Sequence, residues 1–272
     1  MPKYKHSCPK NYEVDFYSGC PFNCIYCIAQ NRHESNSTAI YSTAELDQEI
    51  KHSDQSDIPF YLSPWTDPYQ ELEKNCKLTR HALSKLFMLN RKYFVVTKSC
   101  LVARDVEFFR NNPRCFVAVS LNSLDQSVLD RTEPKLPTAE QRLNLVADLI
   151  NDQVKTVVKI DPVIPGITDG ILMEALINSI IKVKPFAVTT ETVRINKKIA
   201  ENIKLHLSSM QYKKLISYYP PLNHRPQHPQ LEYRIKLFNW MKQLFTVQNI
   251  PISFCRASFP IKLTKYDCRG GF

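Results

Sequence analysis

Short apolar runs alternate with amphipathic segments along most of this chain, and that alternation limits the folds open to it. The apolar runs cover 12–17, 58–62, 93–97, 115–121, 156–160 and 186–190. Apolar residues recur every three or four positions in the segments between them, 43–51, 78–89, 103–111, 138–151 and 170–182. Strands that alternate with helices in this way form a parallel sheet with right-handed helical crossovers. The sequence therefore predicts an α/β fold, a partial (βα)6 TIM-like barrel.

The pattern changes after residue 190. Two long helical runs, about 208–218 and 229–245, precede a short strand-like segment at 251–255. A full eight-unit barrel would need two more strands than the sequence supplies, and no Gly/Ser-rich linker marks a domain boundary. We therefore expect residues 1–195 to form the barrel. Residues 196–272 are expected to form a helical C-terminal extension packed on it, not an independent domain.

Composition narrows the class of protein. The 272 residues are 43% apolar, yet no run approaches the eighteen or more uninterrupted apolar residues of a membrane span. The start, Met-Pro-Lys-Tyr-Lys-His, has no apolar signal-peptide core behind it. Nine cysteines are too few for a disulfide scaffold and suit free thiols and metal ligands in a reducing compartment. We expect a cytoplasmic protein with no membrane attachment.

The formal net charge is +10, from 36 basic and 26 acidic residues. Such an excess attracts nucleic acid, although solvated surface lysines produce the same balance. The stretches 212–219 and 223–225 combine basic and aromatic side chains. They suit stacking on bases and pairing with phosphates, or else an ordinary helix with a basic solvent face. Nucleic acid is thus one candidate partner.

Cys20, Cys24 and Cys27 lie in one short segment, with three and then two residues between them. Thiolates suit iron–sulfur chemistry, and a compact triplet with no fourth cysteine nearby would leave one iron of a [4Fe–4S] cube open. Two alternatives remain at this point. A zinc site would need a fourth ligand, for which His33 is the close candidate, and three unrelated core cysteines would need no metal.

Polar residues just past each predicted strand are further site candidates, because chemistry in α/β barrels lies at the carboxyl ends of the strands. Asp67 suits a substrate amine, and Lys98 suits a carboxylate. Ser120 and Asn122 share one face at strand spacing and suit ribose hydroxyls or a carboxylate. A turn at Asp67 and a helix cap at Ser120 or Asn122 are the structural alternatives. The apolar segment 161–166 offers backbone groups to an adenine.

The cysteine triplet, with the aromatic Tyr26 directly before its last cysteine, resembles the signature of the radical S-adenosylmethionine superfamily. Over roughly 12–169 the chain resembles, within that superfamily, the enzymes related to spore photoproduct lyase. The motifs that carry this resemblance are Thr66-Asp-Pro-Tyr-Gln70, Leu78-Thr-Arg80, Thr97-Lys98, Val119-Ser-Leu-Asn122, Arg131-Thr-Glu-Pro134 and Pro162-Val-Ile-Pro-Gly166.

The resemblance implies a [4Fe–4S] cluster on the three cysteines, with the methionine part of S-adenosylmethionine bound to the open iron. It also implies contacts to S-adenosylmethionine from the residues at Thr66, Lys98 and Ser120. Taken with the positions at the predicted strand ends, the expected cofactor-binding set is Tyr26, Thr66, Asp67, Lys98, Ser120, Asn122 and Val163.

The reaction implied by the resemblance is reductive cleavage of S-adenosylmethionine to a 5′-deoxyadenosyl radical. The electron would come from a reductant protein such as a flavodoxin or ferredoxin. The implied substrate is nucleic acid, of the kind that carries a DNA photoproduct. Two alternatives remain: radical modification of a peptide or small metabolite, and an iron–sulfur redox or binding protein that never cleaves S-adenosylmethionine.

Photoproduct lyase uses a cysteine as hydrogen donor, and the late cysteines of this chain are Cys255 and Cys268. Cys255 follows the strand-like segment, whereas Cys268 lies in the terminal tail. Both are candidate hydrogen donors, since a thiol near a radical site can give up a hydrogen atom. An inert buried thiol is the alternative for Cys255, and a second cluster that uses both cysteines is another.

Overall fold

The computed structural model describes residues 9–31, 37–53, 57–255 and 269. In this part of the chain seven parallel strands form one sheet in sequential order. The strands are β1 Tyr12–Val14, β2 Phe60–Leu62, β3 Tyr93–Thr97, β4 Cys115–Ser120, β5 Thr156–Val163, β6 Ala187–Thr192 and β7 Ile252–Phe254. The predicted α/β fold of the partial-barrel type is confirmed. Each of the six predicted strands overlaps one of β1 to β6, and the strand-like segment 251–255 contains β7, which pairs with β6.

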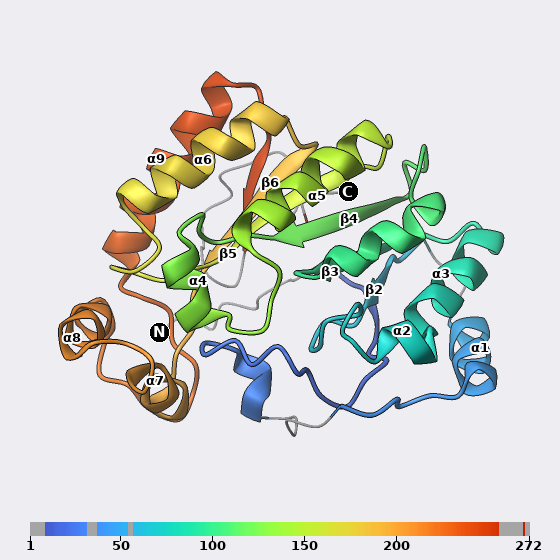
Figure 1. Cartoon of the computed structure of the whole chain (residues 1–272), viewed down its shortest axis with the longest axis horizontal. Coiled ribbons are helices and arrows are strands. Elements are labelled where there is room, and N and C mark those ends of the chain that lie inside the picture. The colour runs from blue at the N-terminus through green and yellow to red at the C-terminus, as the bar shows by residue number, and fades with distance from the viewer. Residues whose placement is uncertain (1–8, 32–36, 54–56, 256–268, 270–272) are drawn as a thin grey trace.

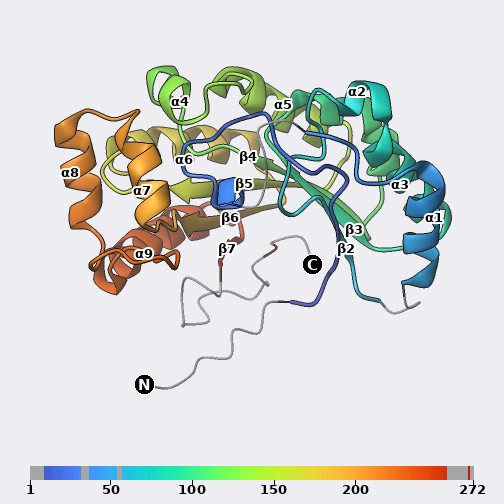
Figure 2. The same ribbon diagram turned by 90° about the horizontal axis from the view of Figure 1, so that it is seen from below.

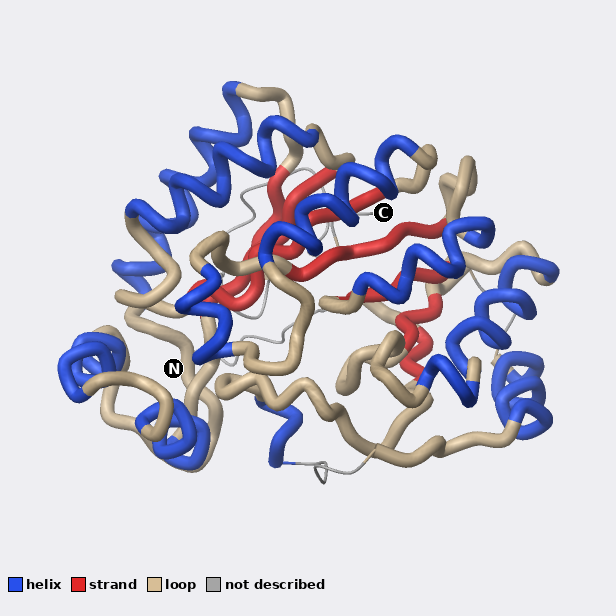
Figure 3. Tube along the Cα trace, in the orientation of Figure 1, coloured by secondary structure: helices blue, strands red, loops and turns tan. Residues whose placement is uncertain are grey.

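Helices follow most of the strands and cover one face of the sheet (Figures 1 and 2). They are α1 Thr43–His52, α2 Glu73–Cys76, α3 Leu78–Met88, α4 Gln126–Thr132, α5 Ala139–Asn151, α6 Ile171–Val183, α7 Lys197–Lys204, α8 Ser209–Ser217 and α9 Leu231–Val247, with 3₁₀ segments η1 Ile28–Asn31 and η2 Cys100–Phe108. Figure 3 shows the strands together in the middle of the molecule, with the helices outside them. Within the described ranges, no helix is long and apolar enough to cross a membrane.

Local sequence explains where the main helices begin. Ser42 and Thr138 each accept a hydrogen bond from the backbone N–H three residues later, and the residue there bonds back to the cap. Such reciprocal capping satisfies backbone donors that a helix start leaves free. The predicted helix at 103–111 is instead the 3₁₀ segment η2, with a non-helical backbone at Asp105. Asp105 is fully buried against two arginines, so tertiary contacts override the helical pattern there.

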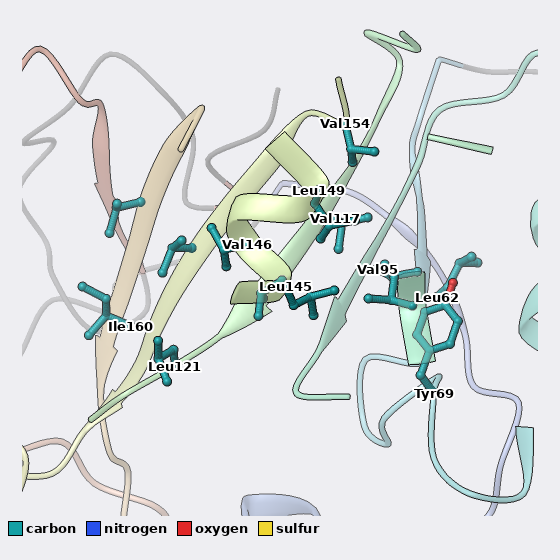
Figure 4. Close-up of a cluster of buried hydrophobic side chains, with 14 of the residues drawn as sticks. Leu62, Tyr69, Val95, Val117, Leu121, Leu145, Val146, Leu149, Val154 and Ile160 are labelled. Atoms are coloured by element: carbon teal, nitrogen blue, oxygen red, sulfur yellow. The ribbon is translucent and has the colours of Figure 1, made fainter. Parts of the chain in front are cut away.

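Alternate residues of each strand point to opposite faces of the sheet. Toward the helices, Val95 and Val117 pack in the main core together with Leu145, Val146 and Leu149 of α5 (Figure 4). The opposite face is called the inner face below. A smaller cluster made only of strand residues lies there: Tyr61, Phe94, Val96, Phe116, Ala118, Val157 and Ala187.

A second core lies past the carboxyl ends of the strands. It joins Ile25 and Tyr26 of the cysteine segment to α7 and α8, which form a pair at one end of the molecule (Figure 1). Asn202 of α7 donates a hydrogen bond to the carbonyl oxygen of Ile25 at 2.8 Å. Helices of the C-terminal region thus hold the segment that carries the cysteines.

Candidate active site

The cysteine segment follows β1 and is fixed from several sides. The Ile25 N–H donates to the carbonyl oxygen of Thr132, which ends α4, at 3.0 Å. The buried Gln70 donates from Nε2 to the carbonyl oxygen of Gly19 at 3.1 Å. Asn23 has φ 54°, in the left-handed region that asparagine tolerates better than most residues. The sharp turns between the cysteines are therefore built into the backbone.

The three thiols lie close enough to influence one another. Burial, and next the Asp67 carboxylate, raise the pKa of Cys20 to about 11, while the N–H groups of Phe22 and Asp67 donate to its sulfur and oppose the rise. Burial raises the pKa of Cys24 well above its ordinary value, against the opposing effect of the Lys98 ammonium. Cys27 acts electrostatically on both of the other thiols.

Three thiolates with one ligand position left open suit a [4Fe–4S] cluster by their donor chemistry. Among the residues that the structure describes, no three His, Cys, Asp or Glu side chains are placed to hold one metal ion. Zinc–sulfur bonds are about 2.3 Å long, which draws all ligands around one point. A [4Fe–4S] cube instead binds each thiolate to a different iron. His33, the further zinc ligand considered above, lies outside the described residues.

Asp67 ties the loop after β2 to the end of β3. One carboxylate oxygen accepts the Tyr69 N–H at 2.9 Å and the Thr97 hydroxyl at 2.7 Å, and the other accepts the Lys98 N–H at 2.8 Å. Burial raises the pKa of Asp67, and these hydrogen bonds oppose that rise. Both oxygens already have partners within the chain, which is the anchoring role of a turn. The predicted role of Asp67 in holding an amine, and its place in the cofactor-binding set, stay predictions.

Lys98 lies beside the cysteine segment. Burial alone would lower the pKa of Lys98, but the neighbouring Cys24 and Glu133 outweigh it and raise that pKa. The lysine is thus a fixed positive charge next to the middle cysteine. The buried Thr66 lies near Asp15 just after β1, with its hydroxyl 3.5 Å from the aspartate oxygen.

Asn122 places an unsatisfied polar group at this edge of the sheet. Its side chain is fully buried, and neither amide atom has a hydrogen-bond partner. Strand alternation places it on the same face as Ser120, which is also buried. An unsatisfied buried polar group costs about 1–3 kcal/mol, so a bound molecule is expected to supply the partners. Val163 is buried at the end of β5, and its carbonyl oxygen accepts the Val193 N–H at 2.9 Å.

Sequence reasoning missed a buried ion pair behind this site. Glu133 and Arg142 are 2.7 Å apart, and both side chains are fully buried. The Tyr26 hydroxyl donates to the other Glu133 oxygen, and Arg142 donates to the carbonyl oxygen of Ser120 at 3.2 Å. A signal existed, because Arg142 falls on the apolar stripe of α5, where a charge is out of place. The pair connects the cysteine segment to the end of β4.

A second missed group lies on the inner face at β5 to β7. The Lys159 ammonium and the Asp161 carboxylate are 2.6 Å apart, and Glu191 follows on β6. Cys255 comes just after β7, and its thiol hydrogen-bonds to Glu191. The signal in the sequence was two charged residues, Lys159 and Asp161, inside a mostly apolar strand. Cys268 lies outside the described residues.

The structure favours an ordinary helix with a basic solvent face for the basic and aromatic stretch at 212–219. The buried Tyr219 hydroxyl donates to the carbonyl oxygen of Val193 at 2.8 Å. Tyr218 packs on Tyr233, with ring centroids 4.7 Å apart. Both rings are engaged in packing, which leaves Lys213 and Lys214 as an exposed basic face.

Fold and site together define an α/β partial-barrel protein whose thiolates can hold an iron–sulfur cluster at the carboxyl edge of its sheet. Residues 14–177 match the family model described as the radical SAM superfamily. The match spans more than half of the 272 residues, and the chain belongs to that superfamily. Its cofactors are therefore a [4Fe–4S] cluster and S-adenosylmethionine.

Similar curated proteins include uncharacterized ones from an archaeon and a mycobacterium. An uncharacterized protein of Methanocaldococcus jannaschii is 28% identical over 164 residues, covering 58% of this chain and 62% of that protein. An uncharacterized protein of Mycobacterium tuberculosis is 27% identical over 177 residues, covering 60% and 52%. The chain thus spans 52% to 62% of the length of these relatives.

Solved structures share the fold. A variant of spore photoproduct lyase with a dinucleoside spore photoproduct gives a TM-score of 0.70 at 15% identity, covering 88% of this chain and 75% of that one. Another variant of that enzyme holds AdoMet as well as the photoproduct, with a TM-score of 0.67 at 14% identity, covering 89% and 75%. Streptococcus suis SuiB bound to the precursor peptide SuiA gives 0.63 at 13% identity, covering 97% and 56%. Identities this low concern the fold alone.

Proposed function

We propose that the protein is a radical enzyme that reductively cleaves S-adenosylmethionine and acts on a nucleic-acid substrate. The observation that carries the first part is the convergence at one sheet edge of three cysteines, the Lys98 ammonium beside Cys24, and the unpartnered amide of Asn122. Membership of the radical SAM superfamily supports the same reading. A flavodoxin- or ferredoxin-like protein is the proposed electron source.

Each residue has a proposed task. Cys20, Cys24 and Cys27 hold the cluster as thiolates, and the positive charge of Lys98 favours their ionised form and pairs with the methionine carboxylate. Ser120 and Asn122 bind ribose hydroxyls or that carboxylate. When bound, the cluster and S-adenosylmethionine supply a 5′-deoxyadenosyl radical.

The remaining members of the cofactor set have supporting tasks in this proposal. Tyr26, held through its hydroxyl by Glu133, shapes the segment that carries the cysteines. Thr66 and the anchored Asp67 complete the edge on the β2 side. Val163 contributes its apolar surface and backbone beside the adenine.

The net charge of +10 supports nucleic acid as the substrate class. The fold-level neighbour that binds a dinucleoside photoproduct is consistent with it. Modification of a peptide is the second candidate, favoured by the fold likeness to a protein bound to its precursor peptide. Cys255 is the proposed hydrogen-atom donor, because its thiol is on the inner-face side of β7 next to Glu191. Cys268 stays a weaker candidate from sequence alone.

Anaerobic reconstitution with iron and sulfide, followed by dithionite and S-adenosylmethionine, tests the enzyme proposal. We expect 5′-deoxyadenosine from the wild-type protein and none from the Cys24→Ala variant. A cluster-loaded protein that yields no 5′-deoxyadenosine would contradict radical catalysis and favour the redox or binding alternative. Substrate class is then tested by adding an oligonucleotide or a peptide mixture and measuring which one increases product formation. Nucleic-acid affinity should also fall steeply as salt rises.

A further inference from the structure

Charged side chains gather on the inner face of the sheet, beside the expected cofactor residues but distinct from them. β5 places Lys159 and Asp161 there, and β6 places Glu191 there. Lys159 lies opposite Thr189 in the sheet register, so neighbouring strands contribute to one polar layer. Their side chains are mostly buried, Lys159 being 25% exposed and Glu191 10%. Burying charge costs several kcal/mol per ion, so such a group indicates a function.

The charges in this group cancel in pairs. Lys159 faces Asp161 at 2.6 Å, and Glu191 faces the Arg194 guanidinium at 3.0 Å. His228 approaches Glu191 at 4.0 Å. The Arg234 guanidinium and the Lys98 ammonium are also within electrostatic reach of these carboxylates, but the cations nearest to them, Lys159 and Arg194, are already paired. A site evolved to hold a phosphate here would instead present an uncompensated positive charge.

Below the polar layer lies an apolar floor. The rings of Tyr61, Phe94 and Phe116 form a stack, with centroid separations of 4.5 and 4.8 Å. Burial raises the pKa of Tyr61 to about 12, and Lys159 opposes the rise. The Tyr61 hydroxyl therefore stays protonated at neutral pH and is available to donate a hydrogen bond close to the Lys159 ammonium.

This layer adjoins the cofactor residues. The negative charge of Asp161 raises the pKa of both Lys159 and Lys98, so it lies within electrostatic reach of each. Lys98 in turn lies beside Cys24. A molecule bound to the polar layer would consequently sit next to the edge where the cysteines and Lys98 meet.

We propose that Lys159, Asp161 and Glu191, with the Tyr61 hydroxyl, bind the reacting part of the substrate, and that this part is an uncharged nucleobase, not a phosphate. The inference rests on the proposed function and deepens it. Lys159 retains two N–H groups after its bond to Asp161, and these suit a ring carbonyl. The carboxylates accept from ring N–H or amino groups. A phosphate here would have to compete with the Asp161 and Glu191 carboxylates for cations that are already paired, so backbone phosphates would stay outside this layer.

Equilibrium dialysis of the anaerobically reconstituted protein with S-adenosylmethionine tests this assignment. The probes are the four deoxynucleosides, their 5′-monophosphates and inorganic phosphate. We expect at least one nucleoside to bind, its monophosphate to bind no more tightly, and inorganic phosphate not to compete. Lys159→Met should weaken nucleoside binding about tenfold or more, the loss of one charge-assisted hydrogen bond. The matched control is Lys155→Met. Lys155 directly precedes β5, at the amino end of the strand, and its ammonium lies over the Phe186 ring, so this substitution should leave nucleoside binding unchanged.

Glu191→Gln, which keeps the side-chain volume, is a second variant should Lys159→Met fail to fold, and it should also weaken nucleoside binding. Competition by inorganic phosphate, or equal nucleoside affinity in the Lys159→Met and Lys155→Met proteins, would overturn the assignment. Formation of 5′-deoxyadenosine by the same wild-type preparation separates this outcome from failure of the proposed function. A protein that cleaves S-adenosylmethionine yet binds no nucleoside contradicts the nucleobase site alone.

Discussion

The two halves of the carboxyl edge are built differently. On the β1 to β4 half, the charged side chains are bound by the protein itself, although the Asn122 amide is left without a partner: Asp67 accepts three hydrogen bonds from the chain, and Glu133 is held by Tyr26 and Arg142. On the β5 to β7 half, Lys159 and Glu191 have charged partners but keep unused hydrogen-bonding capacity. The first half is a rigid frame for cofactors that do not vary, and the second can adapt to a substrate.

The β1 to β4 half should lose cluster binding completely when one cluster ligand is removed. Cys24→Ala deletes one of three thiolates, so we expect loss of the iron–sulfur absorbance and of bound iron after reconstitution. Cys100→Ala is the matched control, because Cys100 is a half-buried thiol at the start of η2 with only a weak contact to the Gln141 carbonyl. Equal iron content in the two variants would show that Cys24 is not a ligand.

The buried ion pair should dominate the stability of the same half. Arg142→Ala leaves Glu133 buried without its charge partner, and breaking such a pair costs about 3–5 kcal/mol of the free energy of unfolding. Arg110→Ala provides the control, since Arg110 pairs with Asp152 at the surface and exposed pairs contribute about 1 kcal/mol or less. Denaturant unfolding of both apoproteins measures the difference. Similar losses in the two variants would mean that the buried Glu133–Arg142 pair stabilises the fold no more than an exposed pair does.

A smaller effect is expected at Thr97, where a loss of S-adenosylmethionine binding can be distinguished from a loss of stability. Thr97→Val removes one hydroxyl donor from the buried Asp67 and should cost about 1–3 kcal/mol. Thr156→Val removes a comparable buried hydroxyl, which donates to the Val154 carbonyl at the amino end of β5. We expect similar losses of stability, but weaker S-adenosylmethionine binding only for Thr97→Val. Isothermal titration of the reconstituted proteins tests this, and unchanged affinity in both would remove Asp67 from the cofactor edge.

The contrast between the halves also explains which features could be predicted from the sequence. Strand positions followed from apolar runs, and the cysteines followed from spacing, because both are local patterns. Glu133 directly follows α4 and Arg142 lies in α5, so their pairing depends on how α4 and α5 pack. Lys159 and Glu191 meet only through the register of β5 and β6, which the sequence does not encode locally. Local sequence patterns therefore predicted the strands and the cysteine site, whereas the two charged clusters depend on long-range contacts.

The smallest expected effect concerns Glu191 on the β5 to β7 half, and it is a change in how the free energy of unfolding depends on pH. Burial, followed by the neighbouring Asp161 charge, raises the pKa of Glu191, so its native-state pKa lies above its unfolded-state value. The folded protein then binds a proton more tightly than the unfolded chain, and Glu191 costs stability as pH rises from the ordinary glutamate range through the raised pKa. Glu191→Gln removes that titration, so its free energy of unfolding relative to wild type should increase across this window and level off above it. Parallel pH profiles for the two proteins would mean that Glu191 is already ionised and fully compensated by Arg194, which would leave the inner face without an adjustable acid.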